Sequence, residues 1–185
     1  MSRTRALISR LGRLLFLGVA SLTLSEQTLR AQLLDEYKVK AAFLYNFTKF
    51  VEWPQQAFRS PGDPLTICIL GENPFGSALT EMANASTLNG RRVGEREIRS
   101  TQEANGCQIL FISSSERYQV RAIMKELQGA SILTVGDVPG FARLGTIVDF
   151  ILQDNKVRFE FNTAAAARAQ LKISSKLLSL ANIVR

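Results

Sequence analysis

The chain has 185 residues, of which 46% are hydrophobic and 21% are charged, and this composition is typical of one folded globular domain. It contains no histidine, which excludes Ser-His-Asp and Cys-His catalysis as well as metal sites built on imidazole. A net charge of +7 suggests an acidic partner such as nucleic acid only if the basic residues form one surface.

The N-terminal segment has the pattern of a cleavable secretory signal peptide, predicted over residues 1–31. Four arginines precede the apolar run Leu14–Leu24, and a polar stretch leads to the small residue Ala31. The run has eleven residues, whereas a helix that crosses a bilayer needs about 20, so no stable membrane anchor is expected. An amphipathic surface helix is the alternative interpretation. The sequence therefore predicts an exported protein with its folded domain over residues 32–185.

Much of the positive charge lies in this leader, which holds five arginines and one glutamate, so that residues 32–185 carry a net charge of +3. The remaining basic cluster, Arg91–Arg99, is interrupted by Glu95 and Glu97. Charges of this kind protect an edge strand of a sheet from pairing with other chains. The sequence therefore predicts a solvated edge strand here and no nucleic-acid partner.

The two cysteines, Cys68 and Cys107, form an even pair with no other possible partner in the chain. In an oxidising compartment one disulfide between them is the expected state, and it would stabilise the fold by about 4 kcal/mol. Two unpaired buried thiols are the alternative. Two thiolates without imidazole are too few ligands for a metal site, so none is predicted.

The first element after the leader is predicted to be a helix from about Leu34 to Glu52, ended by Trp53 and Pro54. Five aromatic residues gather in and just after its second half: Phe43, Tyr45, Phe47, Phe50 and Trp53. Core packing explains them most simply, and a partner or dimer surface is the alternative.

The rest of the chain alternates predicted strands and helices. The strands are expected at 65–70, 92–99, 108–112, 132–135, 146–152 and 156–162. Helices are expected at 74–83, at 116–127 with Ser114 or Ser115 as the cap, and from Thr163. A last helix is expected at the C-terminus, where Leu177, Leu178, Ala181 and Val184 line one face. This order predicts a single-domain α/β sandwich with a mixed sheet of about six strands, parallel in its centre and antiparallel at the edge formed by the last hairpin.

Paired carboxylates are the remaining candidates for catalysis, since two at the right separation could hydrolyse a glycoside. Asp137 and Asp154 lie in turns that explain them without chemistry. Asp149 and Glu160 lie within apolar strands, where they could pair with Lys156 or Arg158 across the hairpin, contact a ligand or partner, or act in catalysis. Surface pairing is the simplest of these, and no catalytic residue or cofactor is predicted.

Four segments carry a resemblance to a known family. They are Tyr37–Pro54, Leu133–Ala142, Val157–Asn162 and Leu171–Ala181. In this order, together with the leader and both cysteines, they resemble the YfiR/HmsC-like family of exported bacterial proteins. The match covers nearly all of the chain after the leader.

The resemblance implies a non-enzymatic periplasmic regulator with an α/β sandwich fold, often dimeric, and a disulfide at the positions of Cys68 and Cys107. Members of the family bind the periplasmic domain of an inner-membrane diguanylate cyclase and hold it inactive, so that cyclic di-GMP and biofilm formation fall. The present chain has no cysteines for the second disulfide of the better-studied branch.

Family contacts with the cyclase map to Val148, Glu160 and Ala166, and a small-ligand patch maps to Lys172 and Ser174. The leading hypothesis is therefore a repressor that presents its aromatic helix and C-terminal hairpin to a membrane receptor. The alternative is a periplasmic small-ligand-binding module that serves another membrane sensor, such as a histidine kinase.

Overall fold

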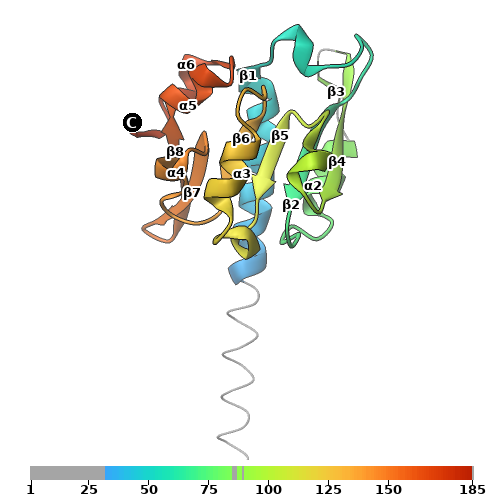
Figure 1. Cartoon of the computed structure of the whole chain (residues 1–185). Coiled ribbons are helices and arrows are strands. Elements are labelled where there is room, and N and C mark those ends of the chain that lie inside the picture. Colours follow the sequence, from blue (N-terminus) through green and yellow to red (C-terminus); the bar gives the residue numbers. More distant parts are fainter. Residues whose placement is uncertain (1–31, 85–86, 89, 185) are drawn as a thin grey trace, which may run out of the picture. The chain divides into compact units, whose positions relative to one another are not determined.

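A computed structural model describes residues 32–84, 87–88 and 90–184 (Figure 1). The chain divides into two compact units, residues 1–36 and 37–185. Within the first unit, residues 32–36 are helical, and the predicted signal peptide over 1–31 lies outside the described residues. The second unit contains the strands that the structure describes.

An eight-stranded mixed sheet forms the centre of this unit, in the order β10-β8-β7-β6-β5-β2-β4-β3. Its strands are β2 Leu65–Leu70, β3 Thr87–Leu88, β4 Arg91–Ile98, β5 Ile109–Ile112, β6 Leu133–Gly136, β7 Val148–Gln153, β8 Lys156–Asn162 and β10 Asn182–Val184. In the sheet, the neighbouring strands β4, β2, β5, β6 and β7 are parallel, and so are β8 and β10. The β7–β8 and β3–β4 pairs are antiparallel.

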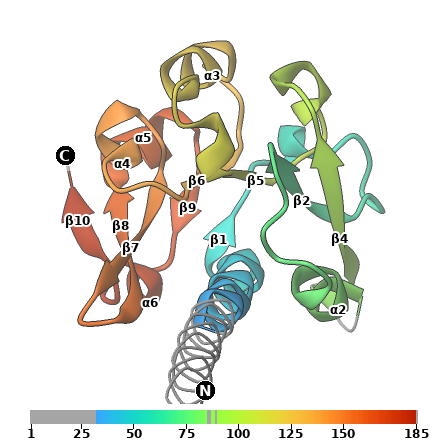
Figure 2. The same ribbon diagram turned by 90° about the horizontal axis from the view of Figure 1, so that it is seen from below.

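Helices cover both faces of the sheet. A helix over residues 37–50, here called the N-terminal helix, lies with α2 on one face, and α3 and α4 lie on the other (Figure 2). The α-helices that follow it are α2 Ala78–Asn84, α3 Val120–Glu126, α4 Phe141–Leu144, α5 Thr163–Arg168 and α6 Ser175–Leu178. The predicted α/β sandwich with a mixed sheet is confirmed, with eight strands in the sheet rather than about six.

Two apolar clusters fill the space between these layers. The larger one joins the N-terminal helix, through Leu44 and Phe47, to the aromatic residues of β7 and β8. The smaller one lies under α3 and contains both cysteines. Strands β2 and β5 are buried almost throughout, as expected for central strands covered on both faces.

The disulfide between Cys68 and Cys107 is present, with the two Cα atoms 5.7 Å apart, and it links β2 to the segment two residues before β5. These two strands are parallel neighbours, so the bridge and the topology agree. The alternative of two free thiols is thereby excluded. The prediction of one intramolecular bridge is confirmed.

Three helix boundaries differ from the prediction. The N-terminal helix ends at residue 50, since β1 Val51–Glu52 pairs with β9 Lys172–Ile173 in a separate two-stranded sheet. Pro74 lies in a turn, where the Phe75 amide donates to the Asn73 side chain, and α2 begins only at Ala78.

Ser113, rather than Ser114 or Ser115, caps the turn Ser114–Glu116, because its hydroxyl accepts from the Ser115 amide. That turn is a 3-10 helix of its own, and α3 follows it at Val120.

The predicted last helix is also wrong. Only Ser175–Leu178 is helical there, and the chain then extends as β10, parallel to β8. In addition, the charged strand β4 is second from the edge, because β3 pairs with Arg91 and Arg92. Within the described residues β3 covers only those two positions, so the remainder of β4 has no strand partner on that side, and it exposes Arg96 and Glu97.

Candidate functional site

The three residues predicted to contact a partner lie in one region but differ in exposure. Val148 and Ala166 are buried, at 0% and 2% exposure, while Glu160 is half-buried. Val148 lies on β7 and Glu160 on the adjacent strand β8, and Ala166 follows on α5. Glu160 is therefore the member of this set whose side chain a partner can reach in this structure.

Alternation along β8 explains this difference. Phe159 contacts the rings of Phe43 and Phe47 on the N-terminal helix, at centroid distances of 5.5 and 5.4 Å. Because successive side chains of a strand point to opposite faces, Glu160 lies on the other face, together with Asn162. The side-chain amide of Asn162 donates to the Ala142 carbonyl of α4. Glu160 thus belongs to the face that α4 partly covers.

Directly opposite Glu160 in the antiparallel register is Asp149, which has no exposed surface. Its Oδ2 atom accepts from the Ala142 amide at the start of α4, while Oδ1 has no hydrogen-bond partner. Burial raises the pKa of Asp149 to about 7, the backbone amides of residues 140–142 oppose this rise, and the charge of Glu160 adds to it. The predicted surface pairing of Asp149 with Lys156 or Arg158 is wrong.

Gly136 at the end of β6 makes room for this carboxylate. A Cβ atom there would lie 2.6 Å from Asp149 Oδ1 and 2.7 Å from a ring carbon of Phe141. The Gly-Asp-Val-Pro-Gly segment therefore does more than form a turn: its first glycine lets the Asp149 side chain lie beside β6. A lone carboxylate in an apolar strand is the sequence signal for this site, but it does not show which face is covered.

Asp137, in the same segment, also has a partner far away in the sequence. Lys40 Nζ donates to its Oδ1 at 2.6 Å and the Tyr37 hydroxyl donates to its Oδ2 at 2.7 Å. The ion pair is nearly inaccessible, with side-chain exposures of 7% and 1%. The expected local turn role of Asp137 thus misses its contact with the N-terminal helix.

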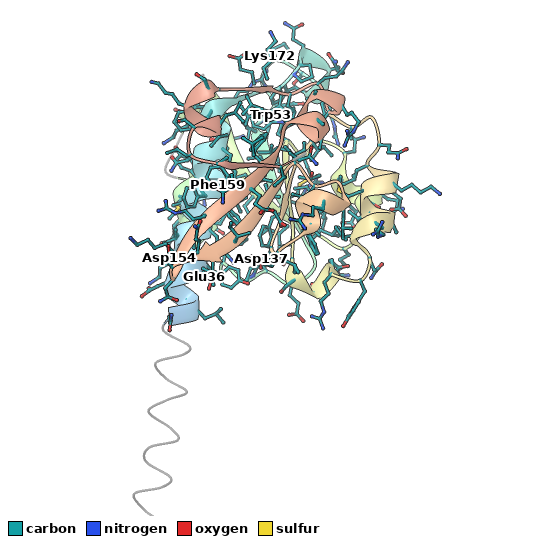
Figure 3. All side chains as sticks on the ribbon, turned by 90° about the vertical axis from the view of Figure 1, so that its left-hand side faces the viewer. Glu36, Trp53, Asp137, Asp154, Phe159 and Lys172 are labelled. Atoms are coloured by element: carbon teal, nitrogen blue, oxygen red, sulfur yellow. A yellow bond between two sulfur atoms is a disulfide. The ribbon has the colours of Figure 1, made fainter. Side chains whose placement is uncertain are left out.

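The predicted ligand patch has a structural explanation. Ser174 caps α6, since its hydroxyl accepts from the Lys176 amide, and its own amide donates to the Phe50 carbonyl. Lys172 is exposed on β9, opposite Glu52. Figure 3 shows Lys172 at the opposite end of the molecule from Asp154 at the tip of the β7–β8 hairpin. The structure therefore does not bring this patch together with the hairpin tip.

The five aromatic residues of the N-terminal helix and its end pack against the core. Phe47 is fully buried, and Phe43, Tyr45, Phe50 and Trp53 are partly buried against the larger apolar cluster. The Trp53 indole also donates to the Gln108 carbonyl at 2.9 Å. Core packing, rather than an exposed aromatic docking surface, therefore explains them.

An exposed apolar edge lies at the C-terminus instead. Leu180 and Ile183 are 68% and 49% exposed. Ile183 lies on β10, the last strand of the sheet, next to the segment of β8 that contains Glu160. We call Glu160, Leu180 and Ile183 the C-terminal edge. The sequence did not indicate it, because residues up to Val184 were predicted to be helical.

The described residues contain no group of three or more cysteine, aspartate or glutamate side chains that could hold a metal ion. None of the helices described is long and apolar enough to cross a membrane. Asp149 and Glu160 do lie side by side, as paired catalytic carboxylates would, but Asp149 is inaccessible to a substrate.

The sequence profile of the YfiR/HmsC-like family matches residues 37–182, and the chain belongs to this family. The predicted family is thereby confirmed. No curated protein matches the chain.

Solved structures resemble the chain more distantly. One is a conserved domain protein from Vibrio cholerae O1 biovar El Tor, with 10% identity and a TM-score of 0.47 over 65% of this chain and 54% of that chain. Another is the ABC domain in complex with L-Trp from Streptococcus pneumonia, with 12% identity and a TM-score of 0.47 over 65% and 55%. The chain thus covers about half of each of these structures.

Proposed function

We propose that this protein is a periplasmic regulator that binds and represses the periplasmic sensor domain of an inner-membrane diguanylate cyclase, thereby lowering cyclic di-GMP and biofilm formation. The observation that carries the proposal is membership of the YfiR/HmsC-like family over residues 37–182. The bridge between Cys68 and Cys107 supports it, because structural disulfides persist in oxidising compartments such as the periplasm. The predicted leader over residues 1–31 would deliver the chain there.

The receptor is proposed to dock on the C-terminal edge. Glu160 supplies a charge on one face of the sheet, and Ile183, in register with Phe161, supplies apolar surface on the other face, so a receptor would contact both faces around this edge, with Leu180 adding exposed apolar surface. Strand β10 pairs with β8 on one side only within the described sheet, so its outer side can accept a strand from a partner. Val148 and Ala166 would act from beneath this surface, by holding β7 and α5 in place. The same edge could pair two copies of the chain, and a homodimer stays a prediction.

The proposal is tested by measuring cyclic di-GMP in the native host with and without the gene. Deletion should raise the level, because an active cyclase would lose its repressor. Restoring the wild-type gene should lower it again. An unchanged level after deletion, in a strain that normally makes the protein, would contradict the proposal.

A charge reversal tests the docking surface itself. Glu160→Arg should fail to restore repression, whereas Glu72→Arg should restore it fully. Glu72 is a matched control because it is exposed and follows β2, on the far side of β7, β6 and β5 from β8. Equal repression by the two variants would show that Glu160 does not contact the receptor. It would not contradict the regulatory role, which the deletion experiment tests separately.

A further inference from the structure

A cavity of about 550 Å³ opens between α3, the segment that joins α4 to β7, and α5. This volume falls in the range of small-molecule sites, which is about 300–1,000 Å³. Its walls are largely apolar, with Met124 on α3 and Leu127 just after it, Leu144 at the end of α4, and Ile147 and Ala165 opposite. A ligand with an apolar body would fit such walls.

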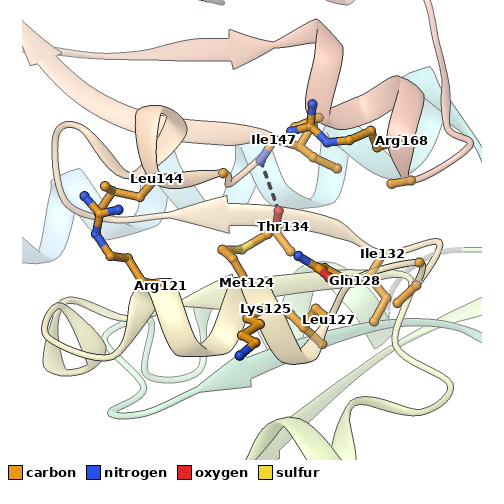
Figure 4. Close-up of a pocket in the computed structure, with 15 residues that line it drawn as sticks. Arg121, Met124, Lys125, Leu127, Gln128, Ile132, Thr134, Leu144, Ile147 and Arg168 are labelled. Atoms are coloured by element: carbon orange, nitrogen blue, oxygen red, sulfur yellow. Dashed lines mark hydrogen bonds between the residues drawn. The ribbon is translucent and has the colours of Figure 1, made fainter.

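The charged side chains that line this cavity are all positive. Arg121 and Lys125 come from α3, and Arg168 comes from α5 across the opening, while no acidic residue lines the cavity. Figure 4 shows Arg121 and Arg168 on opposite walls. None of these three side chains has a hydrogen bond or ion pair with another residue of the described chain. They are therefore available to an external anion, and arginine suits this task because its planar guanidinium can bind a carboxylate through two bonds.

The floor adds one oriented polar group. Thr134 is buried, with 2% of the residue exposed, and its hydroxyl oxygen accepts from the Ile147 amide at 3.0 Å. That bond uses the oxygen as an acceptor, so its hydrogen remains to be donated. A hydroxyl held in this way lies among the apolar walls of the cavity (Figure 4). The cavity thus combines a buried hydroxyl donor, an apolar wall and a basic rim.

We propose that this cavity binds a small organic anion with an apolar body, held by its carboxylate at the basic rim that Arg121, Lys125 and Arg168 form. The apolar part lies against Met124 and Ile147. The inference goes beyond the proposed function, since it assigns a ligand site that does not require a receptor. The site also differs from the Lys172 and Ser174 patch, neither of which lines the cavity.

Position links this site to the proposed docking surface. Ala165 and Arg168 line the cavity, and Ala166 between them is one of the residues proposed to support the partner contact. Helix α5 contains all three and follows directly from β8, where Glu160 lies. A ligand in the cavity is therefore placed to change the presentation of the C-terminal edge.

The test is isothermal titration calorimetry on the purified chain with 2-naphthoate, an aromatic carboxylate, and with 2-naphthalenemethanol, its neutral counterpart. The carboxylate should bind at one site. The Arg121→Gln/Arg168→Gln double variant should bind it at least about tenfold more weakly, the loss expected when charge-assisted hydrogen bonds are removed. Both side chains are exposed, so the variant should unfold at the same temperature as the wild type.

Arg143→Gln is the matched control, because Arg143 is an exposed arginine on α4 that does not line the cavity. Its affinity for 2-naphthoate should equal that of the wild type. Three results would each overturn the proposal: no saturable binding of the carboxylate at millimolar concentration, equal binding of the neutral alcohol, or full affinity in the double variant. None of these results bears on repression of a cyclase, so the two proposals fail separately.

Discussion

The two halves of the sheet are built differently inside. In the half around β2 and β5 the interior is closed by the disulfide between Cys68 and Cys107 and contains no buried ionisable side chain among the described residues. In the half around β6, β7 and β8 the interior contains ionisable groups, namely the Lys40–Asp137 ion pair and the Asp149 carboxylate opposite Glu160. The first half stabilises the fold, whereas the second retains buried groups that apolar side chains could have replaced.

The buried ionisable groups indicate that the functional sites lie in the half around β6, β7 and β8. A buried charge that lacks full compensation lowers stability, so its presence needs a reason beyond packing. The charged half also contains the C-terminal edge and one wall of the basic cavity. The half with the disulfide would then act as a rigid support for the half that meets partners.

The largest expected effect comes from breaking the buried ion pair. Lys40→Met should lower the free energy of unfolding by about 3–5 kcal/mol, because it removes the cation of a nearly inaccessible ion pair with Asp137. Urea denaturation at neutral pH measures this. Lys49→Met, at an exposed position of the same helix, should change stability by no more than about 1 kcal/mol. Equal effects of the two variants would show that the pair contributes little.

Next in size is removal of the disulfide from the other half. Cys68→Ser/Cys107→Ser, or reduction of the wild type, should lower the free energy of unfolding by about 2–5 kcal/mol, since the bridge closes a loop with a sequence separation of 39 residues. Thermal unfolding with and without reductant measures the loss. An unchanged melting temperature in the presence of reductant would show that the disulfide does not stabilise this half.

The stability of the half that contains Asp149 should also depend on pH. Burial raises the folded-state pKa of Asp149 from 3.8 to about 7, so the folded protein favours the protonated carboxyl. The stability that this protonated group contributes is fully present below about pH 4, and it is lost as the pH rises to 7 and the group must ionise inside the fold. Asp149→Asn cannot ionise, so its stability relative to wild type should rise between pH 4 and pH 8, by up to about 4 kcal/mol.

Denaturation curves at several pH values check this prediction. Asp154→Asn, in the exposed hairpin, is the matched control and should follow the pH dependence of the wild type. If the stabilities of Asp149→Asn and wild type differ by a constant amount from pH 4 to pH 8, the pKa of Asp149 is not raised.

The smallest effect on stability is expected at the proposed docking surface. Glu160→Arg should change the free energy of unfolding by less than about 1 kcal/mol, as is usual for charges that solvent can reach. Its loss of repression would then be a loss of contact rather than of fold. A large drop in melting temperature would instead make Glu160 a residue that stabilises the charged half.

Much of the fold follows from local sequence patterns. The apolar runs of β2 and β5 are strong enough to predict buried strands, and the Asp154 and Asn155 turn predicts the hairpin, where both residues have positive φ values of 51° and 58°. Even the pairing of the cysteines follows, because only one partner is possible.

The parts that were missed depend on long-range contacts or on very short elements. Strands β1, β9 and β10 have only two or three residues each, too few for a periodic pattern. The ion pair of Asp137 joins positions 97 residues apart in the sequence. The burial of Asp149 likewise depends on α4, a single turn that packs over it. The candidate site was therefore less predictable than the sheet that supports it.

The central claim is that the protein restrains a cyclase from the periplasm, and export-dependent complementation tests it most directly. A host lacking the gene is complemented with the full chain or with residues 32–185 alone, and cyclic di-GMP is quantified at matched protein levels. The account predicts that the full chain lowers cyclic di-GMP and that the chain without its leader does not. Equal lowering by both, or by neither, would contradict it.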